Sequence, residues 1–505
     1  MKYIIAHDLG TSGNKATLFS QNGKLVDSCV HPYPVNYFNG NWAEQDAEDW
    51  WNAVCNSTSK LINKTGIDNS DIAVISFSGQ MMGCLCVDKK GTALRPSIIW
   101  ADSRAVKQSN RLSEKISQWD FYNIVGHRNT ASYGIQKLMW VKENEPEIYE
   151  NTFKMLNAKD YILFKLTGNF YTDYSDANSG GCFDILNHKW SERILEYAEI
   201  EENKLPDVKP STFIGGYVTE NAAKETGLKV GTPVVLGGGD GVTANVGTGS
   251  IKPGKTYCSM GTSAWITTTS EKPIFDEQMR IVNWAHVIPG YYAPNGTMQS
   301  AGGAYNWLKE TICKMEQYDA KLHGKSPYEY INAEIEKSQA GAAGIIFLPY
   351  LLGERAPRWN PYARASFMGI RAETKREDVL RSVLEGVTMN LSICLDILRT
   401  QVDIQELVVI GGGAKSNIWR QIMSDIYNTK VLVPTVLEEA SAMGAAVTGG
   451  VGVGLYNNFE IIEKFIDIQT VHEPNEKNTE TYKETKEIFD AYYYALEPIY
   501  KKYYS

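Results

Sequence analysis

A Gly-Thr-Ser triplet occurs twice in this chain, at residues 10–12 and at residues 261–263. Each copy stands in a turn between two apolar, strand-like runs. A three-residue match is weak by itself, but its recurrence in the same strand–turn–strand setting, half a chain apart, predicts two related domains. The length of 505 residues agrees with this, because a single hydrophobic core rarely serves so long a chain.

The first triplet lies in a polar loop that could hold phosphate. The loop follows an apolar run and leads toward an Asn-Gly turn at residues 22–23, which is a strong hairpin signal. Neither the Rossmann nor the Walker consensus is present. Loop amides and the hydroxyls of Thr11 and Ser12 can still hold phosphate, and Asp8 can hold Mg²⁺ through water. A hairpin corner without a ligand is the alternative. If both triplets bind phosphate, two facing domains would hold a nucleotide between them, as in actin-like ATPases.

A glycine-rich turn with one carboxylate precedes the second triplet. Residues 234–236 read as a buried strand, and three glycines followed by Asp240 come next. Glycines let the backbone turn sharply and approach a ligand closely, and a carboxylate at the end of a strand can be aimed at that ligand. Asp240 is therefore a candidate catalytic residue. Its alternative role is that of a simple turn former.

Other segments have the form expected at the rim of a binding cleft. Two apolar runs, residues 72–77 and 98–100, end in polar or amphipathic side chains, which suits a pocket at the carboxyl edge of a sheet. Asp102 and Arg104, which follow the second run, can equally form a surface pair. Later, a run of glycines at residues 411–413 joins a strand to a helix. Such a run allows a nucleotide to lie against the backbone, but it also occurs in any tight connection between a strand and a helix. The carboxylates in residues 172–176 are expected to cap a helix or face solvent.

Composition excludes several classes of function. The formal net charge of −9 gives no electrostatic reason to bind nucleic acid or an anionic membrane surface. No apolar run approaches the roughly 20 residues that span a bilayer, and the N-terminal residues do not form a signal peptide. The eight cysteines are scattered, without zinc-site spacing. We therefore expect a cytoplasmic protein with reduced thiols.

Five motifs, taken together and in chain order, carry a family resemblance. They are Asp8–Ser12, Gly237–Asp240, Ser259–Ser263, Leu348–Arg355 and Gly411–Ala414. From about residue 3 to about residue 450 the chain resembles the FGGY carbohydrate kinases, most closely their xylulokinase members. The resemblance implies two α/β domains of the actin-like (ribonuclease H-like) kind, with ATP and sugar in the cleft between them. We expect residues 1–248 to form the sugar-binding domain and residues 249–505 the nucleotide-binding domain, and the family suggests a homodimer.

The resemblance also implies roles for individual residues. Asp240 would be the general base that takes the proton from a sugar hydroxyl, and Asp8 would be the carboxylate associated with Mg²⁺. The implied nucleotide contacts are Thr11, Ser12, Lys15, Gly261, Thr262, Gly302, Asn306, Gly413 and Asn417. The implied sugar contacts are Gln80, Met81, Met82, Trp100, Asp102, Arg104 and Asp240. The expected reaction moves the γ-phosphoryl group of MgATP to a hydroxyl of a small sugar, with D-xylulose the first choice.

Two departures from the xylulokinase pattern affect the choice of sugar. Met82 stands where xylulokinases usually have His, and Gly241 stands where they usually have Asn. Both changes remove a polar group expected to face the sugar, and a site that loses hydrogen-bonding groups changes its preference strongly. A kinase for another pentulose, a polyol or a sugar acid such as gluconate is therefore an alternative. An actin-like ATPase with no sugar substrate is a more distant one.

Overall fold

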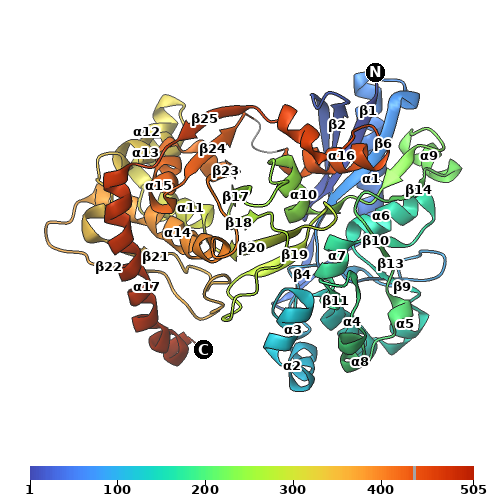
Figure 1. The fold of residues 1–505 in the computed structure, drawn as a ribbon, viewed down its shortest axis with the longest axis horizontal. Coiled ribbons are helices and arrows are strands. Elements are labelled where there is room, and N and C mark those ends of the chain that lie inside the picture. Colours follow the sequence, from blue (N-terminus) through green and yellow to red (C-terminus); the bar gives the residue numbers. More distant parts are fainter. Residues whose placement is uncertain (436–438, 505) are drawn as a thin grey trace.

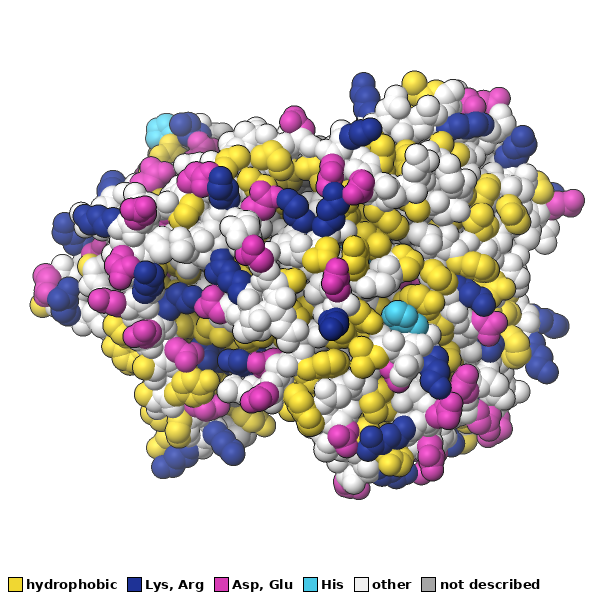
Figure 2. Space-filling model, viewed as in Figure 1, with side chains coloured by type: hydrophobic (Ala, Val, Ile, Leu, Met, Phe, Trp, Pro, Cys, Tyr) yellow, Lys and Arg dark blue, Asp and Glu magenta, His cyan; other side chains and the backbone are white. Residues whose placement is uncertain are grey.

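The structure is a computed structural model that describes residues 1–435 and 439–504. The chain folds into two halves, each built on a seven-stranded sheet. In Figure 1 the first half lies at the blue and green side of the molecule and the second at the orange and red side. Figure 2 shows acidic and basic side chains intermixed over both halves on the face in view, as the modest net charge of −9 leads one to expect.

The first sheet has the strand order β14–β15–β6–β1–β2–β3, with β16 also paired to β6. Its strands are β1 (Tyr3–Leu9), β2 (Gly13–Ser20), β3 (Leu25–Pro32), β6 (Ile72–Gly79), β14 (Ile214–Tyr217), β15 (Pro233–Val235) and β16 (Gly238–Gly239). The antiparallel hairpin β1–β2 carries the first triplet in its turn, and β6 runs parallel to β1. The Asn-Gly signal is confirmed, because Gly23 takes a positive φ of 75° between β2 and β3.

The second sheet repeats this arrangement, in the order β19–β20–β18–β17–β23–β24–β25. Its strands are β17 (Thr256–Met260), β18 (Ala264–Thr268), β19 (Val282–Ala285), β20 (Tyr292–Met298), β23 (Glu406–Ile410), β24 (Lys430–Pro434) and β25 (Ile468–His472). The second triplet lies in the turn of the antiparallel hairpin β17–β18, and β23 runs parallel to β17. The two triplets thus occupy the same place in the two sheets.

Helices cover both sheets. In the first half these are α1 (Ala47–Thr65), capped by Asp46, and α9 (Glu220–Thr226). In the second half they are α11 (Gly302–Thr311), α12 (Lys314–His323), α13 (Pro327–Ile335), α14 (Arg376–Leu398), α15 (Asn417–Tyr427) and α17 (Glu476–Tyr504), with the short pair β21 (Ile346–Leu348) and β22 (Ser366–Met368). Apolar residues of α14 and α15 form one buried cluster with the second sheet, since both helices carry apolar residues at helical spacing.

A largely helical segment extends the first half below its sheet in Figure 1. It holds α2 (Val106–Lys115), α3 (Gln118–Val125), α4 (Gly134–Asn144), α5 (Pro146–Asn151), α6 (Ala158–Thr167), α7 (Tyr174–Ser179) and α8 (Glu192–Ala198). Short strands join these helices: β4 (Asn36–Phe38), β5 (Trp42–Gln45), β7 (Leu85–Val87), β8 (Ser97–Ile98), β9 (Lys154–Leu156), β10 (Tyr171–Asp173), β11 (Phe183–Asp184), β12 (Lys189–Trp190) and β13 (Asp207–Lys209). Most of this segment shares a second buried cluster, whereas the apolar residues of α6 join the cluster of the first sheet.

Two small-residue helices, α10 (Asp240–Gly247) and α16 (Ala440–Gly452), pack together where the halves meet. A Cβ atom on Gly444 would lie 1.8 Å from the carbonyl oxygen of Thr243, so only glycine allows this approach. Although α16 comes late in the chain, its alanines pack on β1, β6 and β15 of the first sheet. The late chain therefore returns to the first half, and a single boundary at residue 248 stays a prediction.

No helix in the described part of the chain has both the length and the apolar character that a membrane crossing requires.

Candidate active site

A cavity of about 240 Å³, here called the cleft cavity, is lined by residues of both halves. The first half contributes Thr11, Gln80, Met81, Met82, Trp100, Asp240, Gly241, Val242 and Asn245. The second contributes Ser263, Trp265, Thr267, Trp284, Ala293, Asn295, Thr297 and Arg355. Five residues predicted to contact the sugar, Gln80, Met81, Met82, Trp100 and Asp240, therefore share one cavity, and Thr11 joins them.

The glycine turn places Asp240 at this cavity. Gly237 has a positive φ of 66°, and a Cβ atom there would lie 2.0 Å from the carbonyl oxygen of Phe77. A Cβ atom on Gly239 would lie 2.5 Å from the sulfur of Met81. The chain can thus pass close beside β6 only because these residues are glycines. Asp240 follows as the first residue of α10, and its carboxylate accepts the N–H of Gly241 at 2.7 Å.

The electrostatic environment suits Asp240 to act as a base. Burial, and then the negative charge of nearby Asp8, raise the pKa of Asp240 to about 7. Asp240 is exposed at the open cleft, where a proton can pass between its carboxylate and a bound hydroxyl. Burial also raises the pKa of Asp8, against the hydrogen bond of Ser78 and the charge of Lys15. A carboxylate with a pKa near neutrality is well matched to accept a proton at physiological pH.

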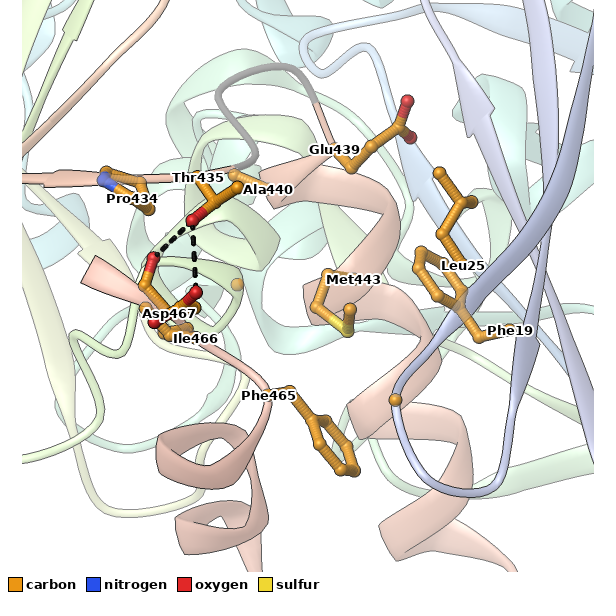
Figure 3. A pocket seen from close by; sticks show the side chains of 12 residues that line it. Phe19, Leu25, Pro434, Thr435, Glu439, Ala440, Met443, Phe465, Ile466 and Asp467 are labelled. Carbon is orange, nitrogen blue, oxygen red and sulfur yellow. Dashed lines mark hydrogen bonds between the residues drawn. The ribbon is translucent and has the colours of Figure 1, made fainter. Parts of the chain in front are cut away.

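Lys15 and Glu439 form an ion pair that joins the two halves. Glu439 comes directly before α16, and its charge also acts on Asp8, whose pKa it raises. In Figure 3 its carboxylate is directed away from Met443 and Phe465, which line a separate cavity of about 210 Å³. No sequence motif singled out Glu439, because its partner Lys15 lies 424 residues away along the chain.

A larger cavity of about 610 Å³ lies within the second half, and we call it the glycine-lined cavity. Its lining includes five of the predicted nucleotide contacts: Gly261, Thr262, Gly302, Asn306 and Gly413. A Cβ atom on Gly302 would lie 2.4 Å from the carbonyl oxygen of Gly261, so the two backbones touch. Tyr305 and Tyr328, with ring centres 4.8 Å apart, add an aromatic wall.

Four other predicted nucleotide contacts lie outside this lining. Ser12 is exposed in the first hairpin turn, and Lys15 pairs with Glu439 as described above. Asn417 is exposed beside the lining residue Ser416, and its side-chain oxygen accepts a hydrogen bond from Arg420 at 3.0 Å. Thr11 lines the cleft cavity instead, and its hydroxyl accepts the indole N–H of Trp100 at 2.9 Å.

The structure corrects the placement of Asp102 and Arg104, which line none of the described cavities. Asp102 is fully buried and pairs with Arg104 at 2.7 Å. The guanidinium of Arg104 also meets Glu44 at 2.7 Å and stacks 3.8 Å above the ring of Trp42. Both groups are therefore committed to partners behind the cleft wall. The local sequence suggested a contact because it shows neither Glu44 nor Trp42 beside them.

Several lining residues of the cleft cavity were not predicted. Trp284, Asn295 and Thr297 come from strands β19 and β20, whose sequences have no distinctive motif. Arg355 ends the motif Leu348–Arg355 and was thus marked by the resemblance, although no role was assigned to it. These residues and Met82 and Trp100 also line an adjoining cavity of about 350 Å³.

Comparison with known proteins identifies the class to which this arrangement belongs. The N-terminal domain model of the FGGY family of carbohydrate kinases matches residues 3–247, and the C-terminal domain model matches residues 256–453. The chain therefore belongs to the FGGY family of carbohydrate kinases and is a sugar kinase. The family resemblance inferred from the motifs is confirmed.

Individual relatives include kinases named for two different sugars. The chain is 33% identical to a xylulose kinase of Bacillus subtilis, covering 97% of this chain and 96% of that protein. It is 31% identical to a gluconokinase of the same species, covering 96% and 94% respectively. A ligand-bound crystal structure of xylulose kinase from Lactobacillus acidophilus matches with a TM-score of 0.92 and 27% identity over 100% of both chains. The predicted fold of two actin-like domains is confirmed.

Proposed function

We propose that this sugar kinase transfers the γ-phosphoryl group of ATP to a hydroxyl of a small sugar bound in the cleft cavity, with Asp240 as general base. The observation that carries this proposal is the position of Asp240. Its carboxylate lies in a cavity that both halves line, and its pKa is raised to about 7. Thr11 of the first hairpin turn and Ser263 of the second line the same cavity.

Catalysis then depends mostly on positioning. Phosphoryl transfer needs little covalent work from a protein, so holding the two substrates in line accounts for much of the rate. Asp240 accepts the proton of the attacking hydroxyl. Backbone amides of the second hairpin turn, at residues 261–263, hold the phosphates, and the glycine-lined cavity takes the adenosine. Approach of the two halves excludes water, which would otherwise compete as the phosphoryl acceptor.

The residues beside Asp240 fit a magnesium ion that arrives with the nucleotide. Asp8 and Glu439 offer carboxylate oxygens, which are the donors that Mg²⁺ prefers, and one oxygen of Glu439 is buried without a hydrogen-bond partner. Among the described residues, no three acidic, histidine or cysteine side chains are grouped closely enough to hold a metal by themselves. This suits an ion that keeps several waters and binds chiefly to phosphate. When bound, Mg²⁺ would neutralise charge on the transferred group.

D-xylulose is the first candidate for the acceptor, and two observations bear on it. Xylulose kinases stand among the most similar relatives. However, Met82 and Gly241 line the cleft cavity and give it no polar side chain at those two positions.

A sugar acid of the gluconate type is the second candidate, and Arg355 favours it. Arg355 lines both the cleft cavity and the adjoining cavity. Its Nε is buried without a hydrogen-bond partner. The neighbouring Glu354 carboxylate accepts the backbone N–H groups of Gln299 and Arg355 and the amide of Asn390, so its oxygens are already engaged. A guanidinium in this position can bind the carboxylate of a sugar acid.

A panel of acceptors with ADP release as the readout tests the proposal. The purified protein, MgATP and one of D-xylulose, D-ribulose, L-xylulose, gluconate or glycerol are combined, and ADP is measured against an acceptor-free control. The sugar that gives the highest kcat/KM identifies the substrate. Slow ADP release that no acceptor accelerates would instead favour the actin-like ATPase alternative. A homodimer and a cytoplasmic location stay predictions.

A further inference from the structure

Helix α7 lies directly behind the cleft cavity and contacts two of its loops. Ser175 and Ser179 stand four residues apart, on the same side of this helix, and both are fully buried. The Oγ of Ser175 accepts the backbone N–H of Gly239 at 2.9 Å. The Oγ of Ser179 accepts the backbone N–H of Met82 at 3.0 Å. One short helix thus holds both the residue before Asp240 and Met82, and Asp240 and Met82 line the same cavity.

The hydroxyl protons of the two serines show that each Oγ is the acceptor in its hydrogen bond with a loop N–H. Ser175 donates its hydroxyl proton to the carboxylate of Asp173 at 2.6 Å. Ser179 donates its proton to the backbone carbonyl of Asp176 at 2.8 Å. A hydroxyl has only one proton, so each oxygen is left as an acceptor for the N–H of a loop. An alanine at either position would leave that buried N–H unpaired.

Ion pairs fix the position of α7 itself. Asp173 caps the helix and pairs with Lys159 at 2.8 Å. Lys159 also meets Asp160 at 2.7 Å and Asp176 at 3.2 Å, and all four side chains are at most 1% exposed. Removing one partner from such a buried group leaves an uncompensated charge, which is strongly unfavourable. The helix therefore cannot shift without a large loss of stability. Of the two roles expected for the carboxylates of residues 172–176, helix capping is confirmed for Asp173, and Asp176 is buried in an ion pair and so fits neither.

The backbone of Met82 shows why its position must be held. Met82 has a positive φ of 63°, which a residue with a side chain rarely adopts. Its N–H is held by Ser179, and its carbonyl accepts a hydrogen bond from the buried ammonium of Lys137 at 2.8 Å. Lys137 also binds the carbonyl of Ile99 at 2.7 Å, next to Trp100. Such a conformation persists only where the surroundings determine it, and it is common at ligand sites.

We infer that α7 sets the distance between Asp240 and the sugar-binding wall, with Ser175 as a positioning residue for the base and Ser179 as a positioning residue for the sugar. This inference rests on the proposed function. Neither serine lines the cleft cavity, so neither touches the substrate. Each acts through the loop whose N–H it binds.

Replacing each serine with alanine separates the two roles. We expect Ser175→Ala to lower kcat by about tenfold or more, because a small displacement of a catalytic group is costly, while the KM for sugar changes by less than about twofold. We expect Ser179→Ala to raise the KM for sugar by about fivefold or more with a smaller change in kcat, because binding and chemistry report different contacts. The KM for ATP should stay constant in both variants.

A matched control is available in the second half. Ser392 is also fully buried in a helix, and its hydroxyl donates to the carbonyl of Met389 at 2.8 Å, but it lines none of the described cavities. Ser392→Ala should change the melting temperature without changing kcat or KM. Melting temperatures of all three variants show how much each loses in stability, so that kinetic effects are compared among folded proteins.

Several outcomes would overturn the inference. It fails if both α7 variants keep the kcat and KM of the wild type. It also fails if only their melting temperatures fall, as expected for Ser392→Ala. If Ser175→Ala does not fold, the KM of Ser179→Ala for sugar decides alone. An unchanged KM then overturns the inference about α7. A wild-type protein that phosphorylates no acceptor would remove the proposed function as well. An active wild type with unaffected serine variants would remove this inference only.

Discussion

The two hairpin turns of this kinase share a sequence, but their threonines line different cavities. In the first, Thr11 lines the cleft cavity and its hydroxyl accepts the indole N–H of Trp100. In the second, Thr262 lines the glycine-lined cavity, while the following Ser263 lines the cleft cavity. The local turn is therefore repeated, and the elements packed around each copy decide which ligand it can meet. A repeated motif therefore predicts a repeated backbone turn more reliably than it predicts that both copies contact the same ligand.

The largest expected effect comes from the group between the two turns. Asp240→Asn should lower kcat by about 10² or more, the scale expected for loss of a general base, while ATP binding stays largely intact. Steady-state kinetics and nucleotide titration of the same preparation measure both quantities. Asp207→Asn, on the exposed side of β13, serves as a charge-matched control and should be kinetically silent. Turnover near the wild-type rate would remove Asp240 from the role of base.

The pH dependence of the wild type should report the same carboxylate. Asp240 must be deprotonated to accept a proton, and its pKa is raised to about 7. Below that pH the protonated fraction grows, so kcat/KM should fall by about tenfold for each further pH unit and level off above it. Initial rates at low sugar concentration, in buffers of constant ionic strength, measure this limb. A profile that stays flat down to pH 5 contradicts the assignment.

Arg355 tests the contribution of the second half to acceptor choice. Arg355→Met should lower kcat/KM for gluconate by about 10- to 100-fold, because a hydrogen bond to a charged group is lost, and should affect D-xylulose much less. Arg364→Met, an arginine outside the described cavities, is the control. Equal losses for the acid and the neutral sugar would show that Arg355 does not recognise a carboxylate.

The two turns can be compared directly by matched substitutions. Thr262→Val should raise the KM for ATP by about fivefold to tenfold, since it removes one hydrogen bond near the nucleotide. Thr11→Val is expected to weaken nucleotide binding less and to raise the KM for sugar, because the hydroxyl of Thr11 orients Trp100. Equal increases in the KM for ATP would show that the two turns contribute equally to nucleotide binding, contrary to this prediction. No effect of either on ATP would make the repeat a coincidence.

The predictable parts of this molecule are those that local physics determines. Strand periodicity placed the hairpins that carry the two triplets, and the Asn-Gly turn placed the hairpin between β2 and β3, because each signal acts within a few residues. The glycine turn before Asp240 was recognisable from its own three glycines, although the atoms that leave no room for side chains there belong to distant segments, such as Phe77 beside Gly237 and Val287 beside Gly238.

Contacts between distant segments could not be predicted in this way. Asp102 and Arg104 were misplaced because Glu44 and Trp42, their actual partners, come from a strand about 60 residues earlier. Asn295 lines the cleft cavity from strand β20, whose sequence has no distinctive motif, and Arg355 lines it from the end of a motif to which no role was assigned. The ion pairs of Lys159 with Asp173 and Asp176 were not predicted, because the burial of a charge depends on which distant segments fold over it. The substrate preference belongs to the same category, since both halves line the cavity.

The smallest expected effect comes from the ion pair that joins the two halves. Lys15 follows the first turn and pairs with Glu439, whose carboxylate competes with any phosphate for that cation. Glu439→Gln should therefore lower the KM for ATP by at most about fivefold, the scale of a partly exposed pair. Glu463→Gln, which breaks an exposed pair with Lys252, should leave the KM unchanged.

If Glu439→Gln instead raises the KM for ATP and weakens the dependence on Mg²⁺, the carboxylate serves the metal rather than Lys15. If only the melting temperature falls, Lys15 holds the halves together and is no phosphate contact. The first turn would then have a structural role, because it would link the two halves, whereas the second turn would bind the nucleotide.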